Sequence, residues 1–248
     1  MKTLRRIAVL LAFSLYFAPS AFASDTLLKH VRAVSQTMSA LYMTSLSEGG
    51  AKYQRDQERY TKIAVETLQQ YAKEDGEQSA ELLKAWEAFS SKLSAVYALG
   101  YGWQVDAYAS RDFRTYLSDV YSLAYEQAKD SKNKQTRLLL AAAQMEAMSA
   151  RFFDIAAAYN GANSLSIQDA DKVPSKAMTK AFKGTLLNIA SSSDKKVAKS
   201  LLAAKSKWEF VEESVVNYSD ASAYFLVYAT KSGINKVLTK TQRLLATK

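Results

Sequence analysis

The chain of 248 residues contains no cysteine, one histidine, two prolines and eight glycines. The absence of cysteine excludes disulfides, thiolate metal sites, a cysteine nucleophile and covalently attached c-type haem. A single histidine excludes a metal site built from several histidines. A hydrophobic fraction of 48% with 23% charged residues is typical of a folded chain. We therefore expect a folded protein with no metal site and no cofactor.

The sequence also lacks the motifs of common enzyme classes. It has no glycine-rich phosphate loop, no His-Glu-x-x-His, no Gly-x-Ser-x-Gly and no Glu-x-x-His. Glu209, Glu212 and Glu213 cluster in one segment but have no identifiable partner, so we interpret them as a solvated helix face. His30 would need a methionine on a facing helix to bind haem, and we interpret it instead as a surface or boundary residue. We predict that the protein is not an enzyme.

The first 23 residues have the pattern of a cleavable export signal. A basic start (Met1 to Arg6) precedes an apolar run from Ile7 to Phe17 and an Ala21-x-Ala23 cleavage signature. The apolar run is too short to remain as a membrane anchor, and no later segment has membrane-spanning length. We predict cleavage after Ala23 and a soluble periplasmic protein with no transmembrane segment. Nucleic acid is absent from that compartment, so the residual positive charge favours acidic surfaces or small anionic ligands instead.

Helical periodicity dominates the remaining chain. Apolar residues recur at alternating steps of three and four over 27–41, 82–96, 138–159 and 201–218. A mean step of 3.5 is typical of seams between nearly parallel or antiparallel helices. The sequence therefore predicts an all-α fold of antiparallel helical bundles.

Glycine, proline and polar clusters mark the ends of the predicted helices. Gly49 and Gly50 end the first, and Asn160 with Gly161 ends the fifth. The polar run 130–134 separates two sets of four. After the first helix, the predicted helices cover 51–74, 78–98, 104–129, 135–159, 175–191, 195–217 and 221–246.

Three short matches relate the two sets of helices in the same order. Met38-Ser-Ala-Leu-Tyr42 matches Met148-Ser-Ala-Arg-Phe152, the segment around Trp86 resembles that around Trp208, and Tyr108-Ala-Ser-Arg111 parallels Tyr228-Ala-Thr-Lys231. Matches in register indicate an internal repeat. We predict two tandem four-helix bundles from an internal duplication, at 24–130 and 131–248.

These stretches resemble the N-terminal periplasmic helical domain of type IV pilus methyl-accepting chemotaxis transducers, which is related to nitrate/nitrite sensor-kinase input domains. The second half keeps the family-like Gln144, Met148, Ser149 and Arg151, whereas the first half has Leu41 in place of the arginine. The resemblance implies a sensor-type bundle with those four residues at a ligand site. Family members carry transmembrane helices and a cytoplasmic signalling part, which this chain lacks, so it would act through a membrane partner or bind without signalling.

Individual charged and aromatic residues leave alternatives open. Arg151 could present its guanidinium to an anion, but an intramolecular salt bridge with a bundle Glu or Asp, or plain exposure to solvent, is the commoner role. Trp103 and Tyr101, near a predicted loop edge, are candidates for a partner surface, whereas Trp86 and Trp208 fall on core seams. Residues 221–248 carry five basic residues and no acid, which we interpret as a solvated helix rather than a docking patch.

The leading hypothesis is an exported, non-enzymatic binding or sensory-accessory protein. Its partner would be a small anionic ligand, a membrane receptor or a pilus-associated protein. The alternative is a structural or assembly factor of an envelope machine such as a type IV pilus. A haem carrier is a third hypothesis, which rests on His30 alone.

Overall fold

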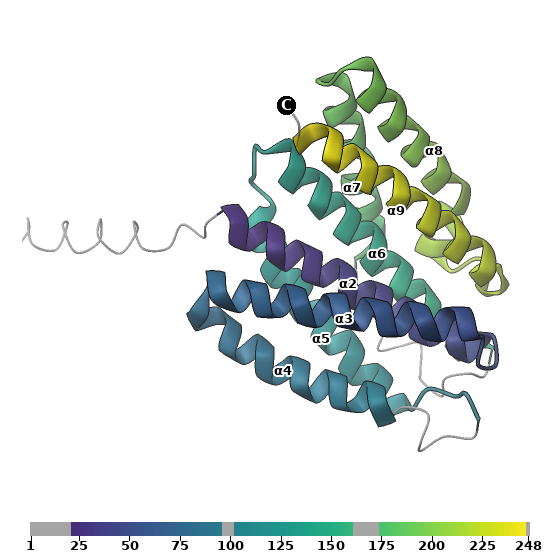
Figure 1. Cartoon of the computed structure of the whole chain (residues 1–248). Helices are drawn as coiled ribbons and strands as arrows, with labels where there is room; N and C mark the ends of the chain where they lie inside the picture. Colours follow the sequence, from purple (N-terminus) through teal and green to yellow (C-terminus); the bar gives the residue numbers. More distant parts are fainter. Residues whose placement is uncertain (1–20, 96–101, 161–173, 247–248) are drawn as a thin grey trace, which may run out of the picture.

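The computed structural model describes residues 21–95, 102–160 and 174–246. In these ranges the chain forms eight α-helices and a short 3-10 helix, with no β-strand, and the predicted all-α fold is confirmed (Figure 1). The helices are α2 (Ala21–Leu46), α3 (Ala51–Glu74), α4 (Gly76–Ala95), α5 (Ala107–Ala128), α6 (Lys134–Tyr159), α7 (Ser175–Ser191), α8 (Lys195–Asn217), η2 (Ala221–Ala223) and α9 (Tyr224–Ala246).

Side-chain caps fix where several helices begin. The carboxylate of Asp106 accepts a hydrogen bond from the backbone N–H of Ala109 at the start of α5. Asn133 caps α6, and Asp194 caps α8 by accepting from two backbone N–H groups. These short polar side chains satisfy N–H groups that have no partner within the helix.

The helices form two groups of four, and each group is closed into a ring by neighbouring contacts. α2 packs against α3 and α5, while α4 joins α3 to α5. In the second group α6 packs against α7 and α9, and α8 joins α7 to α9. α2 also lies along α6, so a single apolar core runs through both groups. The internal duplication itself stays a prediction.

The predicted apolar seams are buried. The seam residues of α2, from Leu27 to Leu41, have at most 1% of their surface exposed, and Trp208 on α8 is fully buried. The indole N–H of Trp208 donates to the Thr179 hydroxyl at 2.7 Å. Burying the apolar seams supplies the main driving force for folding.

The central helix α6 is buried on every side between residues 141 and 157. Such a helix is normally apolar all round. Here it also carries the buried charges Glu146, Arg151 and Asp154. Buried charges are costly unless they are paired, so the stability of the fold depends on the partners of these three residues.

Residues 1–20, 96–101, 161–173 and 247–248 are outside the described part. Two sequence predictions fall there: most of the predicted leader is in 1–20, and the predicted partner-surface residue Tyr101 is in 96–101. Among the helices that are described, none combines the length and the apolar character needed to cross a membrane.

Candidate functional site

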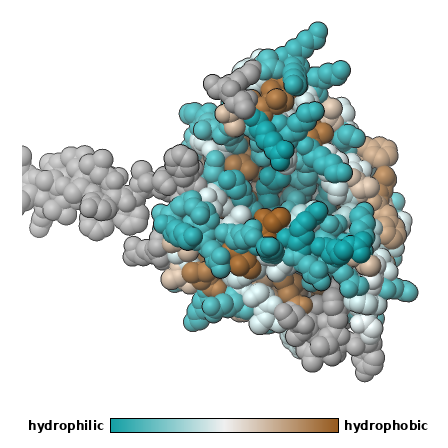
Figure 2. Space-filling model, in the orientation of Figure 1, coloured by the Kyte–Doolittle hydropathy of each residue, from teal (hydrophilic) through white to brown (hydrophobic). Residues whose placement is uncertain are grey.

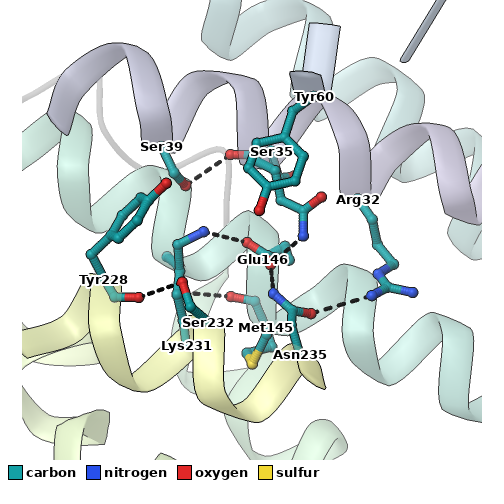
Figure 3. Close-up of polar contacts among 12 residues, drawn as sticks. Arg32, Ser35, Ser39, Tyr60, Met145, Glu146, Tyr228, Lys231, Ser232 and Asn235 are labelled. Carbon is teal, nitrogen blue, oxygen red and sulfur yellow. Dashed lines mark hydrogen bonds and ion pairs between the residues drawn. The ribbon is translucent and has the colours of Figure 1, made fainter. Parts of the chain in front are cut away.

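The carboxylate of Glu146 on α6 has no exposed surface and is surrounded by donors from two other helices. Gln36 Nε2 on α2 donates to Glu146 Oε1 at 2.8 Å, and Lys231 Nζ on α9 donates to Oε2 at 2.8 Å. The Asn235 amide, one turn further along α9, also donates to Oε1 (Figure 3). Glu146 thus ties α2, α6 and α9 together at one point.

Lys231 balances the charge of Glu146 and is itself only 2% exposed. Its ammonium lies 5.0 Å from the centre of the Tyr228 ring and 5.9 Å from that of Phe153. Aromatic faces attract a cation that has lost its water, which partly offsets the cost of burying it. The Glu146–Lys231 pair is therefore a neutral unit beneath the surface.

A second layer of polar contacts lies closer to solvent. Arg32 Nη2 on α2 donates to Asn235 Oδ1 at 3.2 Å, and burial lowers the pKa of the Arg32 guanidinium while the nearby Glu146 charge opposes that shift. On α3, Arg59 Nη2 donates to the Tyr60 hydroxyl at 2.7 Å. Burial raises the pKa of Tyr60, so its hydroxyl stays neutral near pH 7.

The α3 and α9 helices are linked directly through Asp56. The Tyr228 hydroxyl donates to Asp56 Oδ2 at 2.9 Å, and Arg59 pairs with Oδ1 at 2.9 Å. Burial raises the pKa of Tyr228, with the Asp56 charge as a further cause, so the hydroxyl acts as a neutral donor. The charge of Asp56 is compensated within this cluster.

An open groove of about 960 Å³ lies above these contacts, with α3 and α9 as its walls and α2 at its floor. α3 and α9 start close together and diverge toward their last residues on either side of it (Figure 1). Figure 2 shows this face of the molecule, where hydrophilic side chains cover much of both walls. We call this feature the α3–α9 groove.

The α3–α9 groove is strongly basic. Its lining contains Asp56 as a carboxylate and seven cationic residues. The seven are Lys29 and Arg32 from α2, Lys52 and Arg59 from α3, and Lys236, Lys240 and Arg243 from α9. Apart from the Arg59–Asp56 pair, none of them forms an ion pair with another residue that the structure describes. The groove therefore presents uncompensated positive charge to solvent.

The four residues of the predicted ligand site lie on α6 and do not line the α3–α9 groove. Gln144 donates to the Tyr121 hydroxyl at 3.4 Å, and the Ser149 hydroxyl donates to the Met145 carbonyl at 2.8 Å. Met148 is fully buried. These contacts are with the protein itself, and a ligand role for the four residues stays a prediction.

Arg151 is 3% exposed and forms an ion pair with Asp154, at 2.7 Å between Nη1 and Oδ2. Arg114 on α5 approaches the same carboxylate at 3.4 Å. Burial raises the pKa of Asp154, and the two guanidinium groups oppose that shift. Arg151 Nε and Nη2 have no hydrogen-bond partner among the described residues. The intramolecular salt bridge considered for Arg151 is thus present.

Trp103, predicted to be part of a partner surface, is 37% exposed. Its ring lies over Gly49 in the turn between α2 and α3, where a Cβ on residue 49 would come within 2.2 Å of Trp103 Cε2. Gly49 also has a φ of +90°. Part of the Trp103 ring therefore supports the turn, and part of it is accessible.

His30 corrects one expectation from the sequence, because it is fully buried rather than at the surface or boundary. Nδ1 lies 2.9 Å from the Ala64 carbonyl oxygen, and Nε2 lies 2.7 Å from the Tyr116 hydroxyl. Burial lowers the pKa of His30 to about 4. Within the described ranges, no three His, Asp or Glu side chains gather closely enough to hold a metal ion.

Sequence reasoning missed the α3–α9 groove. The signal that pointed to it was the basic run of residues 221–248 without an acid, which we interpreted as a solvated face. Lys231 of this run is buried instead, and Lys236, Lys240 and Arg243 line a groove whose other cations come from α2 and α3, far earlier in the chain. None of the protein-family models, curated proteins or solved structures compared with the chain matches it.

Proposed function

We propose that the protein is a non-enzymatic binding protein that takes an anionic ligand into the α3–α9 groove. The observation that carries this proposal is the excess of seven cationic residues over one carboxylate in the lining, with that carboxylate already paired. A concave surface of one charge sign concentrates the field and attracts ligands of the opposite sign. Lysine and arginine also supply the hydrogen-bond donors that carboxylates and phosphates accept.

The two carboxylates near the groove are neutralised by other side chains, which supports this assignment. Glu146 lies beneath the floor and is neutralised by Lys231, and Asp56 is held by Arg59 and Tyr228. An incoming anion would therefore meet little repulsion. Hydrogen bonds from the lining side chains would then replace the hydrogen bonds to water that the anion loses on entering.

Binding rather than catalysis fits the protonation states in the groove. General acid–base catalysis needs a group that is free to exchange a proton near neutral pH. Asp56 in the lining and Glu146 beneath it each accept hydrogen bonds from neighbouring side chains, and burial raises the pKa of Tyr60 and Tyr228 further above neutral pH. The side chains of the groove are thus arranged to hold a ligand.

The cellular setting belongs to the same proposal. The predicted leader assigns the protein to the periplasm, and the resemblance to chemotaxis-transducer and nitrate-sensor input domains suggests a sensory-accessory role. The anion would be a free small ligand or an acidic surface of a membrane receptor. Both occupants use the charge complementarity that the groove offers.

A structural or assembly role in an envelope machine is the second candidate, and one observation favours it. On α8, Phe210 is 69% exposed and Leu202 is 45% exposed. Contiguous exposed apolar patches mark contacts with other proteins, and these are the two large apolar side chains that α8 exposes. If an envelope protein co-purifies with the wild type but not with Phe210→Ser, and if anion binding is unchanged in that variant, this candidate would be favoured.

Calorimetric titration at low salt tests the proposed function. The wild type should bind citrate and a 15-residue oligoglutamate, because both are multivalent anions. Lys236→Glu/Lys240→Glu should weaken binding at least tenfold, while Lys199→Glu/Lys207→Glu, with the same charge change on the exposed surface of α8, should bind nearly as the wild type does. No binding of either anion, or equal losses in both double variants, would contradict the proposal.

A further inference from the structure

We infer that the occupant of the α3–α9 groove is an acidic amphipathic α-helix of a partner protein, bound along the groove. This inference rests on the proposed function and names the class of ligand. It depends on three features of the lining: its length, its distribution of charge and its apolar surface.

The groove is long compared with a small anion. The lining residues extend from Lys52 to Thr67 on α3 and from Tyr228 to Arg243 on α9. Each wall thus covers 15 helical steps, or about 22 Å at 1.5 Å per residue. A citrate or phosphate ion would contact the cations of only one region, whereas a helix in the wider part of the groove, where α3 and α9 diverge (Figure 1), would reach cations on several turns of its walls.

The positive charge is spread along the groove and is strongest at one end. Lys236, Lys240 and Arg243 follow one another on α9 at steps of four and three, which places them on a single face of that helix. Lys29 on α2 lines the groove together with them. Carboxylates at i, i+3 and i+4 of a bound helix would match this spacing.

The groove also offers apolar surface that a purely hydrophilic polyanion would leave uncovered. Ile63 on α3 lines the groove and is 37% exposed. Tyr60, one turn before Ile63 on α3, also lines the groove and is partly exposed. An occupant with both acidic and apolar side chains satisfies the groove best.

These three features together describe recognition of an amphipathic helix in a groove. An isolated acidic helix of this length is marginally stable in water. The cations would therefore order the segment as it binds, and the apolar contacts at Tyr60 and Ile63 would set its register.

A display library of 16-residue helical peptides with randomised side chains tests the inference with the purified chain. Selected peptides should carry Asp and Glu on one face and apolar residues on another. They should bind Lys236→Glu/Lys240→Glu at least tenfold more weakly, and Lys199→Glu/Lys207→Glu about as well as the wild type. Ile63→Ser should weaken the same peptides severalfold while it leaves the affinity for citrate unchanged.

Other outcomes would overturn the inference in distinguishable ways. If citrate binds and depends on Lys236 and Lys240, but the library yields no peptide that prefers the wild type to the charge-reversed variant, the groove binds anions without recognising a helix. If selected peptides tolerate Ile63→Ser or lack an apolar face, the occupant is a simple polyanion. If neither citrate nor any peptide binds, the proposed function fails together with the inference.

Discussion

Gln36 and Glu146, 110 residues apart in the chain, are joined by a hydrogen bond of 2.8 Å between Nε2 and Oε1. The same separation relates Met38 to Met148 in the repeat predicted from the sequence. Two positions that correspond in the repeat thus meet where α2 lies along α6. The internal duplication predicted from the sequence would make Gln36 and Glu146 equivalent positions, and it stays a prediction.

Glu146 should be essential to stability. Glu146→Leu leaves the Lys231 ammonium buried without a counter-charge, which we expect to lower the free energy of unfolding by about 3–5 kcal/mol. Adding Lys231→Met removes the orphaned charge and should restore most of that loss. Urea denaturation of the two variants and the wild type measures both effects. If Glu146→Leu alone were as stable as Glu146→Leu/Lys231→Met, this result would contradict the pairing of Glu146 with Lys231.

His30 should make stability fall in mild acid. Its pKa is lowered to about 4 in the folded protein from an ordinary value of 6.5, so the unfolded chain binds the proton more tightly. The loss of stability begins as the pH falls below about 6.5 and is complete below about 4, and it is on the order of 3 kcal/mol.

The variant His30→Gln isolates this effect from the titration of the carboxylates. The difference in unfolding free energy between the wild type and His30→Gln should change with pH between about 6.5 and 4 and be constant above that range. Urea denaturation at several pH values measures it. A constant difference over the whole range would show that His30 protonates equally well in both states.

Gly49 should tolerate no side chain. Gly49→Ala requires a non-glycine residue at a φ of +90° and drives a methyl group into the Trp103 ring. We expect a destabilisation of about 1–3 kcal/mol and a shift in the fluorescence of Trp103 as the ring moves. Trp103→Ala in the same background should recover part of the loss, because it removes the clash and leaves only the backbone strain.

Arg151 should matter for stability more than for ligand binding in the groove. Arg151→Met leaves the buried Asp154 carboxylate with the longer Arg114 contact alone, which should cost about 2–4 kcal/mol in thermal or urea unfolding. The affinity for oligoglutamate should stay within about twofold of the wild type, since Arg151 does not line the groove. A large loss of affinity with little loss of stability would instead place the ligand beside Arg151.

Much of the fold could be predicted because apolar periodicity is a local property of the sequence. The seam from Leu27 to Leu41 and the breaks at Gly49 and Asn160 correspond to α2 and to the ends of α2 and α6. The predicted helix over 221–246 is divided into η2 and α9, because the Asp220 carboxylate caps the chain at Ser222 and holds a short 3-10 turn.

The site could not be predicted in the same way, because it depends on contacts between distant helices. Glu146 and Lys231 are 85 residues apart, and their pairing depends on how α6 and α9 pack. His30 was misplaced for a related reason: its burial depends on Tyr116, which is 86 residues away. The cations of the groove belong to three helices, and only the folded arrangement of α2, α3 and α9 brings them to one face (Figure 1).

The central claim, that the α3–α9 groove holds an anion, is tested most directly by mapping amide chemical shifts of the isotope-labelled chain during titration with oligoglutamate. The largest changes should fall on the lining residues of α2, α3 and α9, around Arg32, Tyr60 and Lys240, and they should disappear in Lys236→Glu/Lys240→Glu. Changes centred on Arg151 and α5, or changes that persist in the charge-reversed variant, would contradict the account.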